Sequence, residues 1–165
     1  LLSDAKTHLD ATQVAKVAEL EQKVQGAASG EARAALLKQL SGIWYQLGQF
    51  PVAGGFAEQV AEIENADTSL SVAGATFYNG LAMSQDPIIR SYCADHAVKA
   101  FESAASLNPQ KVDYRVNLAL VYAENPPPDN PMKAVLLLRD LESKHPESAA
   151  VYLSLIHISE PTRPY

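Results

Sequence analysis

Phe77–Pro109 reads FYNGLAMSQDPIIRSYCADHAVKAFESAASLNP, and Tyr114–Pro146 reads YRVNLALVYAENPPPDNPMKAVLLLRDLESKHP. Both stretches open on an aromatic residue, continue with Leu-Ala, and close with alanine, a bulky apolar residue and proline. The matched pairs are Phe77 and Tyr114, Leu81 and Leu118, Ala82 and Ala119, Ala97 and Ala134, Phe101 and Leu138, and Pro109 and Pro146. One copy is a pair of helices that cannot bury its apolar face alone, so copies must stack. The sequence therefore predicts an all-α fold, a superhelix of stacked antiparallel helix pairs.

The segments upstream continue the helical pattern. Ser3–Gln25 has apolar residues at spacings of three and four, which predicts an N-terminal amphipathic helix within residues 1–28. A second apolar stripe predicts a helix over Glu31–Leu47 that ends near Gly48. A shorter helix is expected over Phe56–Asn65, with Pro51 and the Gly54-Gly55 pair in the connection before it.

Proline positions divide the downstream part into helices. Asp86-Pro87 and Asn130-Pro131 are start signals, because Asp or Asn caps a helix and Pro suits its first position. Pro126–Pro128 cannot lie inside a helix and predicts a stiff loop. We therefore divide residues 29–152 into repeats at about 31–66, 68–109 and 110–146, with the start of another at 147–152.

Composition narrows the classes of partner. The chain of 165 residues carries a net charge of −6, which disfavours nucleic acid and anionic membrane surfaces as partners. Cys93 is the single cysteine, so an internal disulfide is excluded. The sequence shows no apolar run near the roughly 20 residues needed to span a bilayer, so we expect this segment to make no membrane contact.

The opening motif Trp44-x2-Leu47-Gly48, Tyr122 in its later copy, and the closing pattern Ala97, Phe101, Ala104 and Pro109 resemble the tetratricopeptide repeat (TPR) family. The resemblance covers about residues 31–152. It departs from the family pattern in the first copy, which lacks the closing proline, and in the longer turns of the second and third copies. The chain is similar to bacterial TPR proteins of poorly defined role. Its localisation stays open between the bacterial cytoplasm and the periplasm.

The resemblance implies a TPR-like solenoid whose first helices line a concave groove that binds a partner protein or peptide. The matching groove positions are Tyr45, Gln49, Asn79, Met83, Val116 and Leu120. None of these six is Lys or Arg, so we do not expect the groove to clamp a C-terminal carboxylate. The predicted function is a non-catalytic protein-interaction scaffold.

Two other functions stay open at this point. The chain could be a helical accessory domain of a larger enzyme or envelope assembly, whose activity lies in another part of the protein. It could also be a helical bundle that binds a small ligand, which predicts a closed apolar pocket with convergent polar groups.

No catalytic residue, cofactor or metal site is predicted. The four histidines, His8, His96, His145 and His157, are not spaced as metal ligands. Cys93 falls on an apolar helical stripe one turn from His96, and this placement indicates core packing in preference to a nucleophile.

Charged residues of the middle helices are interpreted as surface. Glu58, Glu62 and Glu64 are expected on the solvated face of a short helix, and Asp95 and Lys99 are expected to form an i, i+4 ion pair.

Both ends of the chain prompt separate expectations. Leu153–Arg163 resembles the translation of a transposase adapter used in sequencing libraries, so we interpret residues 153–165 as a non-native tail; the alternative is an ordinary short tail. Without a following helix, the apolar face around Val135, Leu138 and Leu141 is expected to be partly uncovered. The chain begins with Leu1 instead of Met, and we expect an N-terminal segment, with any targeting signal, to be missing.

Overall fold

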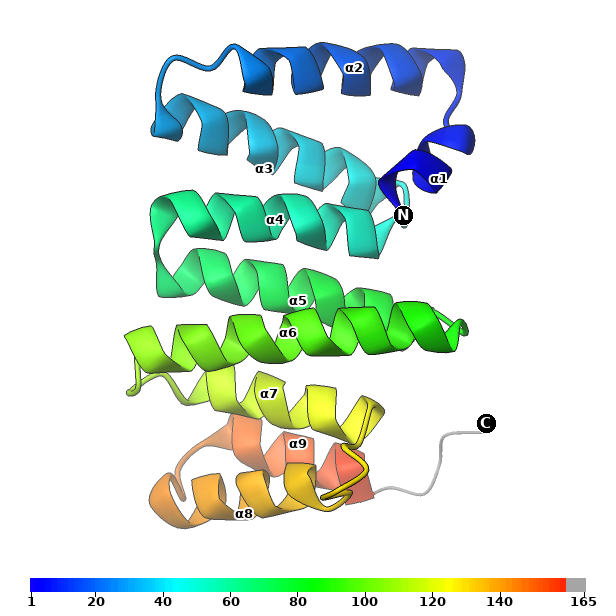
Figure 1. Cartoon of the computed structure of the whole chain (residues 1–165). Helices are drawn as coiled ribbons and strands as arrows, with labels where there is room; N and C mark the ends of the chain where they lie inside the picture. Colours follow the sequence, from blue (N-terminus) through cyan, green and yellow to red (C-terminus); the bar gives the residue numbers. More distant parts are fainter. Residues whose placement is uncertain (160–165) are drawn as a thin grey trace.

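The computed structural model describes residues 1–159, and these residues form α-helices without any β-strand (Figure 1). The nine helices of the described part are α1 (Leu2–Thr7), α2 (Ala11–Gln25), α3 (Gly30–Gln46), α4 (Phe50–Glu64), α5 (Asp67–Met83), α6 (Pro87–Leu107), α7 (Val112–Glu124), α8 (Lys133–Lys144) and α9 (Ala149–Ser159). The expectation of an all-α fold is therefore confirmed.

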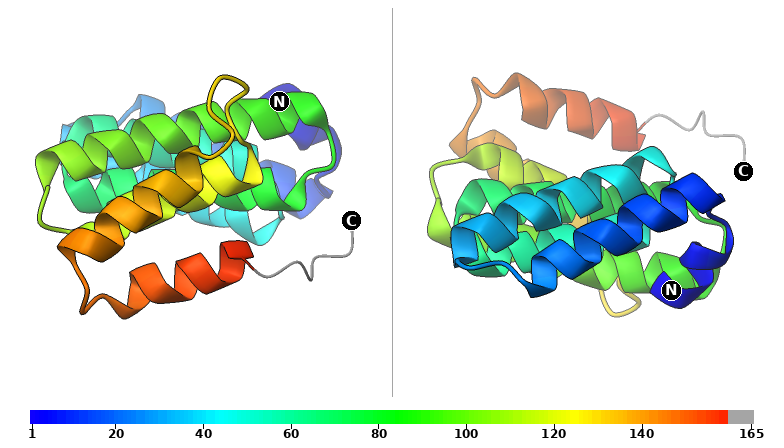
Figure 2. Two further views of the ribbon diagram at one scale, coloured as in Figure 1. Left: turned by 90° about the horizontal axis from the view of Figure 1, so that it is seen from below. Right: turned by 90° about the horizontal axis from the view of Figure 1, so that it is seen from above.

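The helices stack in the order of the sequence. From α2 onward each helix packs against the one that follows it, and short connections reverse the direction of the chain between them (Figure 1). Contacts also join helices two apart, α4 with α6, α5 with α7, and α7 with α9. Viewed from below and above, α9 lies to one side of α7 and α8 (Figure 2).

Polar side chains begin several of the helices. Asp10 and Gln13 form a reciprocal capping box at the start of α2, and the Ser29 hydroxyl accepts from the backbone N–H of Ala32 in α3. The carboxylate of Asp86 accepts from the backbone N–H of Ile88, with Pro87 at the first position of α6. The predicted start signal Asp86-Pro87 is thus confirmed.

Large aromatic residues of alternate helices lie in the core. Trp44 of α3, Phe77 of α5 and Tyr114 of α7 are all buried. Small residues make room for them: a Cβ atom at Gly54 would lie only 2.7 Å from the ring of Phe77. The close approach of Phe77 explains why a glycine occurs inside α4.

Two helix boundaries predicted near the N-terminus are wrong. The expected single helix over Ser3–Gln25 is broken into α1 and α2, because Asp10 caps a new helix. Helix α4 begins at Phe50 and not at Phe56, so Pro51 and the Gly54-Gly55 pair are helical. Pro51 fits because the first helical turn has no intrahelical use for its missing N–H group.

The expectation of an uncovered C-terminal face is also wrong. Leu138 and Leu141 are fully buried and Val135 is half-buried. Helix α9 covers this face, with Val151, Leu155 and Ile158 packed against the same cluster. Residues 153–159 of the suspected tail therefore continue the helix that begins at Ala149, whereas residues 160–165 lie outside the described part; the non-native origin of the tail stays a prediction.

Candidate binding groove

An apolar groove of about 600 Å³ runs between α3 and α5, with α4 as its floor. Each helix contributes residues from the face that it turns toward the groove. The lining residues are Lys38, Ser41, Gly42, Tyr45 and Gln46 from α3, Ala57, Val60 and Glu64 from α4, and Thr68, Ser69, Val72 and Thr76 from α5.

The walls of the groove expose apolar surface to solvent. Val72 is 59% exposed and Tyr45 is 45% exposed, while Ala57 and Val60 form a buried floor. Gly42 widens the groove, because a Cβ atom built on it would meet no other atom within 4 Å. The groove is therefore open to solvent, and an apolar group bound in it would cover the exposed surface of its walls.

One hydrogen bond links the two walls of the groove. The amide Nδ2 of Asn79 donates to the phenolic oxygen of Tyr45 at 3.0 Å. The ring of Tyr45 also packs edge-on against Phe50 at a centroid distance of 5.1 Å, which fixes its orientation from the α4 side. Two of the predicted groove residues, Tyr45 and Asn79, are thus brought together by the fold.

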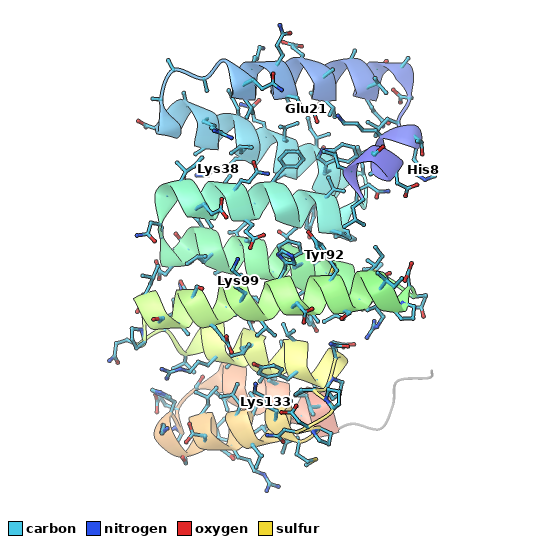
Figure 3. The ribbon with its side chains drawn as sticks, viewed as in Figure 1. His8, Glu21, Lys38, Tyr92, Lys99 and Lys133 are labelled. Atoms are coloured by element: carbon cyan, nitrogen blue, oxygen red, sulfur yellow. The ribbon has the colours of Figure 1, made fainter. Side chains whose placement is uncertain are left out.

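An ion pair occurs where α3 meets the C-terminal end of α4. The Nζ atom of Lys38 lies 2.6 Å from Oε1 of Glu64, and Figure 3 shows Lys38 between α3 and α4. The hydroxyl of Ser69 donates to the other carboxylate oxygen of Glu64. These two hydrogen bonds, with that of Lys38 the stronger cause, lower the pKa of Glu64 below its ordinary value.

Of the six predicted groove residues, only Tyr45 lines this groove; Asn79 contacts Tyr45 beside it, and the other four lie elsewhere. Gln49 and Met83 line a separate hollow of about 280 Å³ beside Leu1. Leu120 is half-buried on α7.

Val116 requires a correction, because it is only 4% exposed. It packs in a core cluster with Leu138, Leu141 and Val151, so α8 and α9 occupy the space where a partner was expected.

Sequence reasoning missed Lys38, Gly42 and Val72 as groove residues. A signal for the first two was present, since Lys38, Gly42 and Tyr45 follow one another at spacings of four and three on α3. Extending the face of Tyr45 toward the N-terminus of its helix would have found them. The absence of a cation from the predicted set is therefore corrected: Lys38 lines the groove, although Glu64 neutralises it.

A second polar cluster joins α4 to α6. Glu58 accepts from Lys99 at 3.2 Å and lies 2.9 Å from Nδ1 of His96. The ring of His96 packs against Phe77 and Tyr92 (Tyr92 and Lys99 are labelled in Figure 3).

These contacts correct two expectations about surface charges. Glu58 is half-buried and pairs with Lys99, whereas Glu62 and Glu64 are exposed as expected, with Glu64 also paired to Lys38. Lys99 pairs with Glu58 of another helix instead of Asp95 on its own helix.

Cys93 lies in the core, as predicted. It is fully buried, and its sulfur would be only 2.7 Å from a Cβ atom built on Gly80. Burial raises the pKa of the Cys93 thiol to about 11. The thiol is therefore protonated near neutral pH and lacks the thiolate character that a nucleophile needs.

Within residues 1–159 no group of three or more His, Cys, Asp or Glu side chains is arranged to hold a metal ion. No helix in that range has both the length and the apolar character to cross a membrane.

Comparison of the chain with protein-family models and with curated proteins gives no match.

Proposed function

We propose that this chain is a non-catalytic interaction scaffold of TPR-like helix pairs, and that the groove between α3 and α5 binds a segment of a partner protein. The observation that carries the proposal is the open apolar groove of about 600 Å³ with the exposed side chains of Tyr45 and Val72 on its walls. Exposed apolar surface that is grouped in a groove is typical of interaction sites.

The stack of helices supports this choice of site. Helix α5 touches α7, and α7 touches α9, so these alternate helices close against one another. Helices α3 and α5 instead leave the groove between them and are bridged by the Tyr45–Asn79 hydrogen bond. Three helices hold the groove, and a rigid wall lowers the entropy lost when a partner binds.

The anchoring role falls to a few side chains. Tyr45 offers a rigid aromatic surface whose orientation is set by Phe50, and Val72 offers an aliphatic surface opposite. Binding energy at interfaces concentrates in such residues, with tyrosine among the favoured types.

The groove is less suited to an enclosed small ligand. The small-ligand hypothesis predicts a closed pocket, whereas Tyr45 and Val72 on the two walls are each about half exposed. A segment of polypeptide can continue out of an open groove at either end, and so it can use the whole apolar surface.

Two glycine variants test the proposal. Gly42→Leu places a leucine side chain in the groove from α3, whereas Gly55→Leu places one on α4 outside the lining of the groove. At both positions a Cβ atom meets no other atom within 4 Å. Peptides are selected from a displayed random library on the native full chain and then titrated against each variant. We expect Gly42→Leu to weaken binding at least about tenfold, or about 1.4 kcal/mol, and Gly55→Leu to leave it unchanged. Selected peptides that bind both variants like the native chain would refute the groove as the site.

A further inference from the structure

The charged residues that line the groove neutralise each other. Of its lining residues, Lys38 and Glu64 carry full charges, and their charged atoms are 2.6 Å apart. Ser69 donates to the second carboxylate oxygen of Glu64, so both oxygens of that carboxylate are occupied. The remaining lining residues are neutral, and the groove has no net charge although the chain as a whole carries −6.

This ion pair determines the electrostatic interaction of the groove with a charged group. An anion that approaches Lys38 meets Glu64 at nearly the same distance, so attraction and repulsion largely cancel. A cation meets the same cancellation with the signs reversed. A charged group that enters must also give up part of its hydration without gaining an opposite charge. A neutral apolar group has no charge to dehydrate, and it covers the exposed surface of Val72 and Tyr45.

We infer that the groove, which is neutral because Lys38 and Glu64 cancel each other, is selective for an uncharged, apolar, internal segment of a partner polypeptide over either charged end of a chain. The inference rests on the proposed function, because it takes the groove as the binding site. Lys38 and Glu64 act as specificity-determining residues: each cancels the field of the other, and removing either one leaves a single charge at the groove.

The pair is well placed for this role. Lys38 comes from α3 and Glu64 from the last turn of α4, so the two charges are brought together by the packing of these helices. The Lys38 side chain is 58% exposed and that of Glu64 is 28% exposed, so a bound segment can reach both. The lowered pKa of Glu64 agrees with a carboxylate that stays ionised at neutral pH.

Three forms of one peptide test the inference with the full-length chain. The peptide Gly-Leu-Phe-Leu-Gly is made with both ends blocked, with a free carboxylate only, and with a free amine only. These forms share every apolar side chain and differ only in their end groups, and hence in charge at neutral pH. Binding is followed by two-dimensional NMR titration at low ionic strength, where charge effects are least screened. Circular dichroism checks that each variant is folded.

The native chain should bind the blocked form more tightly than either charged form. Glu64→Gln leaves Lys38 unpaired and should raise the affinity for the free-carboxylate form relative to the blocked form by about twofold to fivefold, the range for exposed ion pairs. Lys38→Gln should do the same for the free-amine form. The double variant Lys38→Gln/Glu64→Gln should return the native order, because the groove is again neutral.

The outcomes separate this inference from the proposed function. If Gly42→Leu abolishes binding of the blocked peptide but the single charge variants leave the order of the three forms unchanged, the inference is wrong and the groove remains the site. If Gly42→Leu has no effect on a peptide that binds, the proposed function fails as well. A native chain that prefers a charged form, or that binds none of the three at millimolar concentration, overturns the inference directly.

Discussion

Tyr45 of α3 and Asn79 of α5 meet through their side chains: the amide of Asn79 donates to the phenolic oxygen of Tyr45 over 3.0 Å. The bond connects α3 to α5 beside the groove that separates these two helices. It therefore adds a direct link between two walls that also pack on α4.

Tyr45→Phe removes this bond and keeps the ring against Phe50. Because the hydroxyl is partly solvated, we expect a loss of about 0.5–1 kcal/mol in the free energy of unfolding, measured by urea denaturation. Tyr152→Phe is the matched control, since Tyr152 has a similar exposure of 43% on α9. Equal effects from the two substitutions would show that the Tyr45–Asn79 bond does not stabilise the fold.

Two adjacent glycines in α4 should respond in opposite directions to alanine. Gly54→Ala forces a Cβ atom against the buried ring of Phe77, and this overpacking should cost about 1–3 kcal/mol. Gly55→Ala meets no atom within 4 Å and gains helix propensity, so it should stabilise the chain by up to about 1 kcal/mol. Urea denaturation of both variants checks the pair, and a neutral Gly54→Ala would mean that α4 and α5 are less closely packed than described.

Removal of residues 153–165 tests the role of α9. A chain that ends at Tyr152 loses Leu155 and Ile158 from the cluster that covers Leu138 and Leu141. We expect lower hydrogen-exchange protection in α8 and a lower midpoint of thermal unfolding, because apolar surface is exposed to water.

A chain that ends at residue 159 is the control for this truncation, and it should retain the protection of α8. Unchanged protection in the shorter chain would show that the α8 face needs no cover from residues 153–158.

Asp67 should make stability depend on pH in the acid range. Hydrogen bonds from Asn108 and then Tyr114 lower the pKa of Asp67 below its ordinary value of 3.8. A carboxyl whose pKa is lower in the folded state favours folding above the unfolded-state pKa, and that contribution is lost as the pH falls through the folded-state pKa.

Asp67→Asn should therefore reduce the fall in unfolding free energy between about pH 5 and pH 2 relative to the native chain. The measurement is urea denaturation at a series of pH values. Parallel profiles for the native chain and Asp67→Asn would contradict the role assigned to the Asp67 hydrogen bonds.

Local patterns predicted the helices better than their ends. The apolar periodicity and the Asp86-Pro87 signal placed α6 correctly, because a cap and a helical stripe are both read from neighbouring residues. The start of α4 was misplaced because Pro51 and Gly54 are turn residues in most contexts. Their helical role depends on the first turn of α4 and on Phe77, which is far away in the sequence.

The candidate site was predicted only in part for a similar reason. Tyr45 and Asn79 share one place in the predicted repeat; Tyr45 lines the groove, and Asn79 hydrogen-bonds to Tyr45 beside it. Val116 occupies the equivalent place in the next repeat but is buried, because α8 and α9 close over it. Repeat position therefore indicated which face a residue belongs to, and the neighbouring helices decided whether that face is open.

The sequence by itself determined an all-helical chain of successive helices, because helical periodicity follows from residues within one or two turns of each other. Only the tertiary structure decided that a groove opens between α3 and α5, that Lys38 meets Glu64, and that α9 covers Leu138. These features depend on the distances between packed helices. Such distances are set by the combined volumes of side chains from separate segments, which no local pattern contains.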